Sequence, residues 1–199
     1  MSIGKRKSGG GNFDLLLRYD ARHGAAYLCD RVRQPDGTWQ TEQKTINNFT
    51  AVFDLPNIEI GWMAFASNGP PSFKMVKADM GADIGAAPSP KHKEGFRLRL
   101  KLKGDGGSVR EFSSTAAATW QGVDKLHTAF LEEHGKHPGK LPLVKLTGTS
   151  PIKSPMGLSH EPNFQITDWV DRPPELPAPA IADLREDDEE PPYDVESAA

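Results

Sequence analysis

The residues best suited to bind a charged partner are four cations on one side of a predicted strand. Residues 96–103 read FRLRLKLK, so apolar and cationic side chains alternate without interruption. Successive side chains of a strand point to opposite faces, which places all the cations on one face. The cations are Arg97, Arg99, Lys101 and Lys103. They lie about 6.6 Å apart with no intervening acid, which favours a polyanion lying across them over an ordinary solvated sheet face.

Further cations and aromatic residues occur in or beside other predicted strands. The additional cations are Lys91, Lys93, Lys74, Lys77, Arg31 and Arg33. The aromatic candidates for contact with a ligand are Tyr27, Trp39, Phe65 and Phe73, whereas Trp62, Trp120 and Trp169 are expected in the core. Aromatic rings interleaved with cations suit a single-stranded nucleic acid, because every nucleotide offers a base to stack and a phosphate. The sequence therefore predicts sequence-independent binding of single strands.

The sequence contains no convincing enzyme motif. The segments 135–140 (GKHPGK) and 148–154 (GTSPIKS) resemble phosphate-binding loops only superficially, and both contain a central proline. His127, His134 and His137 cluster near a predicted helix end without the cysteine or glutamate spacing of a metal site. The single cysteine, Cys29, is expected to be a half-buried apolar residue. We therefore expect a protein that is not an enzyme and that needs no cofactor or metal.

Charge is divided unevenly along the 199 residues. The chain has 24 bases and 27 acids, a net charge of -3. Residues 183–199 hold eight of the acids and one base, so the rest of the chain has 23 bases against 19 acids. A basic body followed by an acidic terminus predicts an interaction tail, and a tail that serves only solubility is the simpler alternative.

Strand signals dominate the middle of the chain, and one helix is predicted among them. Residues 26–33 and 38–46 flank the turn Pro35-Asp36-Gly37, which predicts a hairpin. A helix is expected after Ser113, Ser114 and Thr115, ending at Gly135, with its apolar face in the core. That face comprises Trp120, Val123, Leu126 or His127, Phe130 and Leu131. Five strand segments begin near residues 57, 72, 96, 141 and 163, and a partner strand is expected at 108–112.

This order predicts a mainly β fold, an OB-like five-stranded barrel with the helix between the third and fourth strands. The early hairpin is then an addition at the N-terminal side. We expect three regions, a flexible basic terminus at 1–12, the nucleic-acid-binding domain at 13–172 and a disordered Pro-rich acidic tail at 173–199.

The chain resembles single-stranded DNA-binding proteins of the OB-fold class, particularly the phage-encoded type with a basic barrel and an acidic tail. The resemblance rests on the element order across 57–172, the strand FRLRLKLK, the closing strand FQITDW and the tail DLREDDEEPPYDVESAA. It implies protection of single-stranded DNA in replication, recombination or repair. It also implies a tail that recruits replication or recombination proteins and competes with DNA for the basic groove. The corresponding tail residues are Glu186, Asp187, Asp188, Glu189, Glu190 and Tyr193.

Two other functions stay open at this stage. One is an RNA-binding OB protein, and the other is an adaptor or inhibitor whose acidic tail mimics DNA. Homo-oligomerisation is also open. No apolar run is long enough for a membrane helix, and no secretory signal is recognised, so we expect no membrane partner and a cytoplasmic protein of a bacterial or phage-infected cell.

Overall fold

The computed structural model describes residues 15–65, 71–78, 82–104, 106, 108–154 and 157–176. It is mainly β, with one α-helix, α1, at Ala117–Glu133. Short 3-10 turns occupy Leu55–Asn57 and His134–Lys136. The strands are β1 (Leu15–Asp20), β2 (Ala25–Arg33), β3 (Trp39–Ile46), β4 (Thr50–Phe53), β5 (Glu59–Ala64), β6 (Ser72–Lys77), β7 (Lys93–Leu102), β8 (Val109–Ser114), β9 (Lys140–Ser154) and β10 (Gly157–Asp171).

These ten strands form one mixed sheet, and its ladders do not close into a barrel within the described residues. The order is β10-β9-β4-β7-β8-β1-β2-β3, with β5 on the same edge of β7 as β4 and β6 beyond β5. All pairs are antiparallel except β1 with β8. The expected mainly β class is confirmed, and the sheet has ten strands where the sequence predicted eight. Strand β1 (LLLRYD) was missed because its leucines are consecutive and do not alternate with polar residues, and β4 was missed because four residues are too few to show an alternation.

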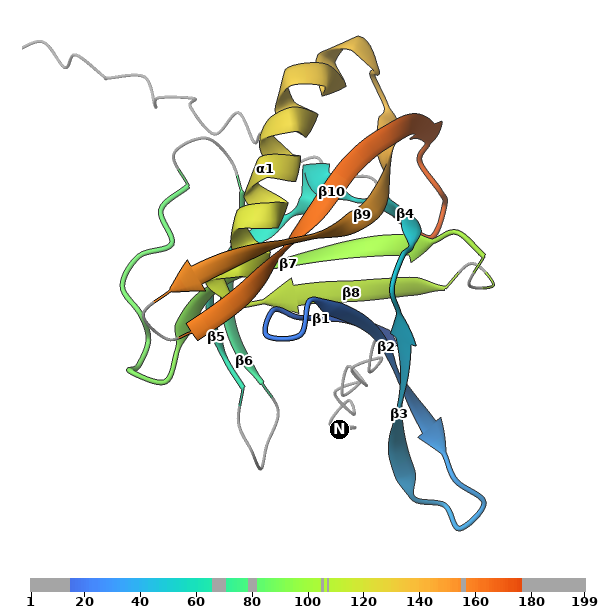
Figure 1. Ribbon diagram of the computed structural model, residues 1–199, viewed down its shortest axis with the longest axis vertical. Coiled ribbons are helices and arrows are strands. Elements are labelled where there is room, and N and C mark those ends of the chain that lie inside the picture. Colours follow the sequence, from blue (N-terminus) through green and yellow to red (C-terminus); the bar gives the residue numbers. More distant parts are fainter. Residues whose placement is uncertain are drawn as a thin grey trace, which may run out of the picture.

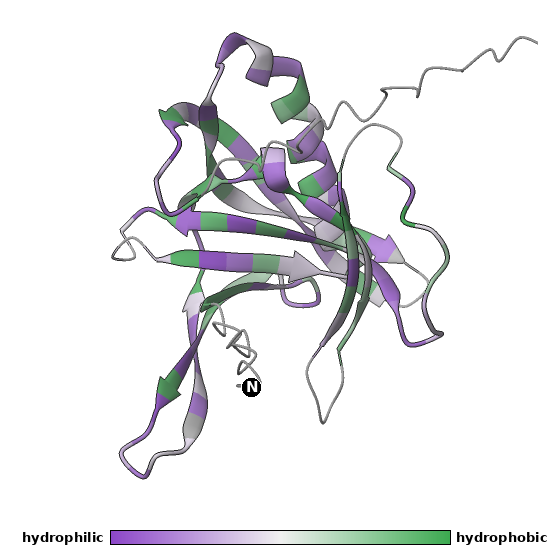
Figure 2. Cartoon of the chain, turned by 180° about the vertical axis from the view of Figure 1, so that it is seen from behind, coloured by the Kyte–Doolittle hydropathy of each residue, from purple (hydrophilic) through white to green (hydrophobic). Residues whose placement is uncertain are grey.

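Strand β7 has the register that its sequence predicts. Phe96, Leu98, Leu100 and Leu102 are at most 6% exposed, whereas Arg97 and Arg99 lie on the other face. Figure 2 shows the resulting alternation of hydrophilic and hydrophobic bands along this strand. The buried row packs with Phe53 and Phe112 in the core. Local alternation therefore fixes which side of this central strand faces the core.

The predicted hairpin is present, and it projects from the body of the sheet (Figure 1). Its turn includes Gly37 at φ +85°, a conformation that favours glycine. The backbone amide of Thr38 donates to the Asp36 carboxylate at 2.9 Å, which closes the turn. The turn chemistry that predicted the hairpin is thus the chemistry that forms it.

Helix α1 packs mainly against β10 (Figure 1). Val123, Leu126 and Phe130 are buried, as the helical spacing predicts, but Leu131 is 47% exposed and does not belong to the core. At Gly122 the strand comes so close that an added Cβ would lie 2.5 Å from the carbonyl oxygen of Pro162. The expected hydroxyl N-cap is absent, since Ala116 occupies that position without a side-chain bond.

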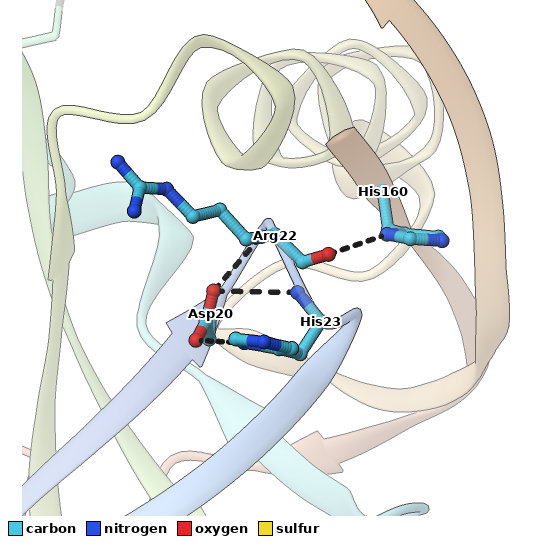
Figure 3. Close-up of polar contacts among 4 residues, drawn as sticks. All are labelled: Asp20, Arg22, His23 and His160. Carbon is cyan, nitrogen blue, oxygen red and sulfur yellow. Dashed lines mark hydrogen bonds and ion pairs between the residues drawn. The ribbon is translucent and has the colours of Figure 1, made fainter. Parts of the chain in front are cut away.

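The edge strand β10 contacts the β1–β2 turn, although no ladder joins β10 to β1 or β2. The backbone amide of His160 in β10 donates to the Ala21 carbonyl at 2.6 Å. The Nδ1 of the His160 ring lies 3.2 Å from the Arg22 carbonyl oxygen (Figure 3). Asp20 accepts backbone hydrogen bonds from Arg22 and His23 within this turn. Hydrogen bonds with the His23 ring and these amides lower the pKa of Asp20. The turn is therefore held in place from both sides.

Packing extends beyond the expected boundary at residue 172. Leu176 is fully buried, and Arg172 forms an ion pair with the buried Asp54 at 2.9 Å. Residues 177–199, which include all six of the predicted partner-binding residues in the tail, and residues 1–14 lie outside the described part of the chain. Within the part that is described, no helix has the length and apolar character needed to span a membrane.

Candidate nucleic-acid interface

The cations of β7 lie on the sheet face opposite the core, which we call the cationic face. Arg97, Arg99 and Lys101 occupy alternate positions there, and Lys103 follows in the turn after the strand. Lys103 and Arg99 are exposed, and the other two cations are partly buried. The β7 cations are thus brought onto one face as predicted.

The pairing of residues between strands shows that the cationic face extends across β8 and β1 to the hairpin. Arg99 lies opposite Glu111, Glu111 opposite Leu16, and Leu16 opposite Cys29. Directly opposed residues share a face, and alternate residues along a strand do so as well. The residues of β2 that share the face with Cys29 are Tyr27, Arg31 and Arg33. Arg33 is opposite Trp39, whose side chain lies outside the described part of the structure.

On the other edge of β7 the same face continues onto β5 and β6. Arg97 is opposite Glu59, and Glu59 is opposite Lys77. The guanidinium of Arg97 lies 5.4 Å from the centroid of the Phe73 ring, a cation–π distance. Phe65 is 58% exposed and packs edge-on against Phe73 at 6.0 Å between centroids. An accessible aromatic pair therefore adjoins the first arginine of β7.

Acids from distant segments lie among these cations, which the sequence of β7 does not reveal. The Nη2 of Arg97 lies 2.6 Å from Glu59, and Lys101 lies 3.0 Å from Glu175. Exposed pairs of this kind contribute about 0–1 kcal/mol, so a phosphate can replace the carboxylate at little cost. Repulsion among the four cations of this row is therefore weaker evidence for a bound polyanion than the sequence suggested. The total charge of the cationic face is a better criterion for polyanion binding.

Counted over β1–β3 and β5–β8, together with Glu175 beside Lys101, the cationic face has eight cations and four acids. The acids are Asp20, Glu59, Glu111 and Glu175. The cations are Arg18, Arg31, Arg33, Lys77, Lys93, Arg97, Arg99 and Lys101. The face thus remains strongly positive after its acids are included, which suits a polyanion.

Some predicted site residues are placed elsewhere. Lys74 is opposite Trp62, on the other face of β6, and its Nζ lies 3.4 Å from the Ala86 carbonyl oxygen. Lys91 lies in the turn before β7 rather than on the sheet. Arg18, in contrast, was missed by the sequence analysis, since the strand β1 that positions it was missed as well.

The histidines near the end of α1 stack on aromatic rings. His134 lies 4.9 Å from Phe130, and His137 lies 4.5 Å from Trp169, each between ring centroids. Burial lowers the pKa of His127, which also stacks on Phe130. No group of three metal-ligating side chains is arranged to hold an ion within the described ranges. These rings have a packing role.

Cys29 is 3% exposed, and burial raises the pKa of its thiol. A thiol with a raised pKa is a weak nucleophile near neutral pH. With Cys29 inert, the cationic face is the best-supported binding surface. Comparison with protein-family models, with curated proteins and with solved structures finds no match to this chain.

Proposed function

We propose that this protein binds single-stranded DNA without sequence preference and protects it during replication, recombination or repair. The observation that supports this function is the gathering of eight cations against four acids on one sheet face, next to exposed Phe65. Cations track a phosphate backbone, and exposed rings stack on bases of any identity. Groups that read base edges are not required for such binding, so sequence independence is expected.

The pairing order supports an OB-like core within the sheet. Strands β4, β7 and β8 form an antiparallel meander, α1 follows, and β9 returns to pair with β4 before β10 pairs with β9. This is the strand order of a partly open OB barrel with its helix between the third and fourth strands. In this interpretation β5 and β6 are an insertion, and β1–β3 are an N-terminal addition. The first three barrel strands are then β4, β7 and β8, where the sequence predicted the segments near 57, 72 and 96.

A filter-binding comparison of one sequence as single-stranded DNA, as RNA and as duplex DNA tests the proposal. We expect the tightest binding to single-stranded DNA, with a slope of log affinity against log salt of about -3 to -4, since four to six phosphate contacts contribute about 0.7 each. Equal or tighter binding to duplex would contradict the proposal, and tighter binding to RNA would favour the RNA-binding alternative. No binding to any of them would leave the adaptor function as the better account.

Truncation of the exposed ring in Phe65→Ala is expected to weaken binding to all single strands. Stacking of a base on an aromatic ring contributes about 1–3 kcal/mol, which corresponds to a loss of roughly 5- to 150-fold in affinity. Stability should change little, because the ring is 58% exposed. Fluorescence anisotropy with labelled oligonucleotides measures the loss. Leu158→Ala, at a residue 52% exposed on β10, is the matched control, and an equal loss there would contradict base stacking at Phe65.

Removal of residues 177–199 is expected to leave the melting temperature unchanged and to tighten DNA binding at low salt. The removed segment has eight acids and one base, so it competes with DNA for cationic surface when screening is weak. A second truncation after Arg172 also deletes the buried Leu176 and the Glu175 partner of Lys101, and it should lower the melting temperature. Thermal melts and salt-dependent anisotropy measure both effects. Weaker DNA binding by the shorter deletion would argue against competition by the tail.

A further inference from the structure

A pocket of about 360 Å³ lies where the base of the hairpin meets the ends of β4 and β7. Three lysines line it, namely Lys44, Lys103 and Lys145. Its apolar lining includes Leu28, Phe49 and Leu102. The pocket volume lies within the range of small-molecule sites.

Three segments that are far apart in the sequence contribute these lysines. Thr50 of β4 lies opposite Lys145 of β9, and its carbonyl accepts the backbone amide of Lys103 at 2.8 Å. Lys103 and Lys145 therefore flank Thr50, about 10 Å apart across two inter-strand spacings. Lys44 of β3 is opposite the buried Leu28, and residues 47–49 connect its strand directly to β4.

The charges in this pocket are not balanced by acids. None of its lining residues is an aspartate or glutamate. Within the described part of the chain, Lys44, Lys103 and Lys145 form no ion pair and no side-chain hydrogen bond. Arg97 and Lys101 on the cationic face, by comparison, each contact a carboxylate. An anion is the partner that three such lysines favour, since lysine binds phosphate as a point charge.

The rest of the lining narrows the class of anion. Asn48 and Thr50 add neutral hydrogen-bonding side chains beside the lysines. Phe49 and Leu102 supply an apolar wall that a free inorganic ion does not need. A phosphomonoester has a charge of about -1.5 to -2 near neutral pH, compared with about -1 for each phosphodiester within a strand. Three lysines next to an apolar wall thus match a phosphomonoester attached to a base better than an internal phosphate of the backbone.

We propose that this pocket binds a nucleoside phosphomonoester, with the phosphate among Lys44, Lys103 and Lys145 and the base against the apolar wall. The ligand chemistry has two sources, a free nucleotide or the 5′-phosphorylated end of a DNA strand. The pocket lies beside the cationic face at the end of β7 and shares only Lys103 with the β7 cations. Binding of a free nucleotide in this pocket does not depend on strand binding.

Two binding measurements on the full chain distinguish these sources. Calorimetric titration with AMP, adenosine and inorganic phosphate tests the free nucleotide. Fluorescence anisotropy with one oligonucleotide of about 12 nucleotides, ending in either a 5′-phosphate or a 5′-hydroxyl, tests binding of the phosphorylated strand end. Each is repeated with the triple variant Lys44→Gln, Lys103→Gln, Lys145→Gln. The matched control is Lys136→Gln, Lys140→Gln, Lys153→Gln, which removes the same charge from exposed lysines that do not line the pocket.

In at least one of the two measurements, we expect the phosphorylated ligand to bind at least about tenfold more tightly than its unphosphorylated form. The pocket variant should abolish that preference, and the control should keep it. AMP binding as weak as that of adenosine, together with equal binding of the two strand ends, would overturn the proposal. Inorganic phosphate binding as tightly as AMP would also overturn it, because the apolar wall would then have no role. General binding of single strands through the cationic face can survive either result, so the two proposals fail separately.

Discussion

Asp30→Ala is expected to lower the free energy of unfolding by about 1–3 kcal/mol, the largest stability effect we predict for a single charged residue. The loss is smaller than for a fully buried pair, because the Asp30 side chain is 39% exposed. Arg110 is only 2% exposed, and its guanidinium forms a two-pronged ion pair with Asp30. Its Nη1 also donates to the Leu16 carbonyl at 3.4 Å. Without the Asp30 carboxylate, the buried guanidinium loses this charged contact, and its desolvation is offset less well. Urea denaturation followed by circular dichroism measures the loss.

Glu42→Ala is the matched control for this effect. Glu42 lies directly opposite Asp30 on β3 and is exposed, so its loss should stay within about 0.5 kcal/mol. Combining Asp30→Leu with Arg110→Met should restore much of the stability, because replacing both partners removes the desolvation cost. A cost for Asp30→Ala no greater than that for Glu42→Ala would show that the ion pair does not stabilise the fold.

The double variant Arg97→Ala, Arg99→Ala is expected to bind single-stranded DNA about 25-fold more weakly at 0.1 M salt than the natural chain. Each phosphate contact contributes about 0.7 to the slope of log affinity against log salt, so two contacts contribute about 1.4. Over the one decade of salt between 1 M and 0.1 M, this is about 1.4 logarithmic units of affinity, or about 25-fold. The loss should be similar for all sequences, and the slope should become shallower by about 1.4. Anisotropy titrations across a salt series measure both quantities.

Folding of this variant should be nearly unaffected, since the buried row of β7 is untouched and Arg97 loses only a partly exposed pair with Glu59. Lys136→Ala, Lys153→Ala removes two exposed cations that lie off the cationic face and controls for net charge. An Arg97/Arg99 variant that melts normally and retains its affinity and salt slope would show that this row does not contact DNA. Leu98→Asp is unsuitable as a binding test, because a carboxylate in the core should unfold the protein.

Several elements could be predicted from the sequence because their signals are local. The alternation in FRLRLKLK specifies which side of β7 is buried, and the turn at 35–37 specifies the hairpin. Apolar spacing locates α1 to within two residues at each end. Each of these features depends on neighbours within about ten residues, and the side-chain period is a property of the backbone itself.

Only the tertiary structure decided which distant residues meet. Glu59 is 38 positions from Arg97, Glu175 is 74 positions from Lys101, and Asp30 is 80 positions from Arg110. The short strand β4 likewise gains its place from pairing with β7 and β9 rather than from its own four residues, and that pairing assembles the lysine pocket.

The sequence by itself thus determined the mainly β class, the register of β7, the hairpin and the helix, all of which follow from local periodicity and turn chemistry. The tertiary structure alone decided how the ten strands are ordered, which cations are balanced by acids, and that Lys44, Lys103 and Lys145 share one pocket. The physical reason is that ladder partners are chosen by the burial and packing of whole segments against one another, and residue alternation within a strand contains no information about the strand beside it.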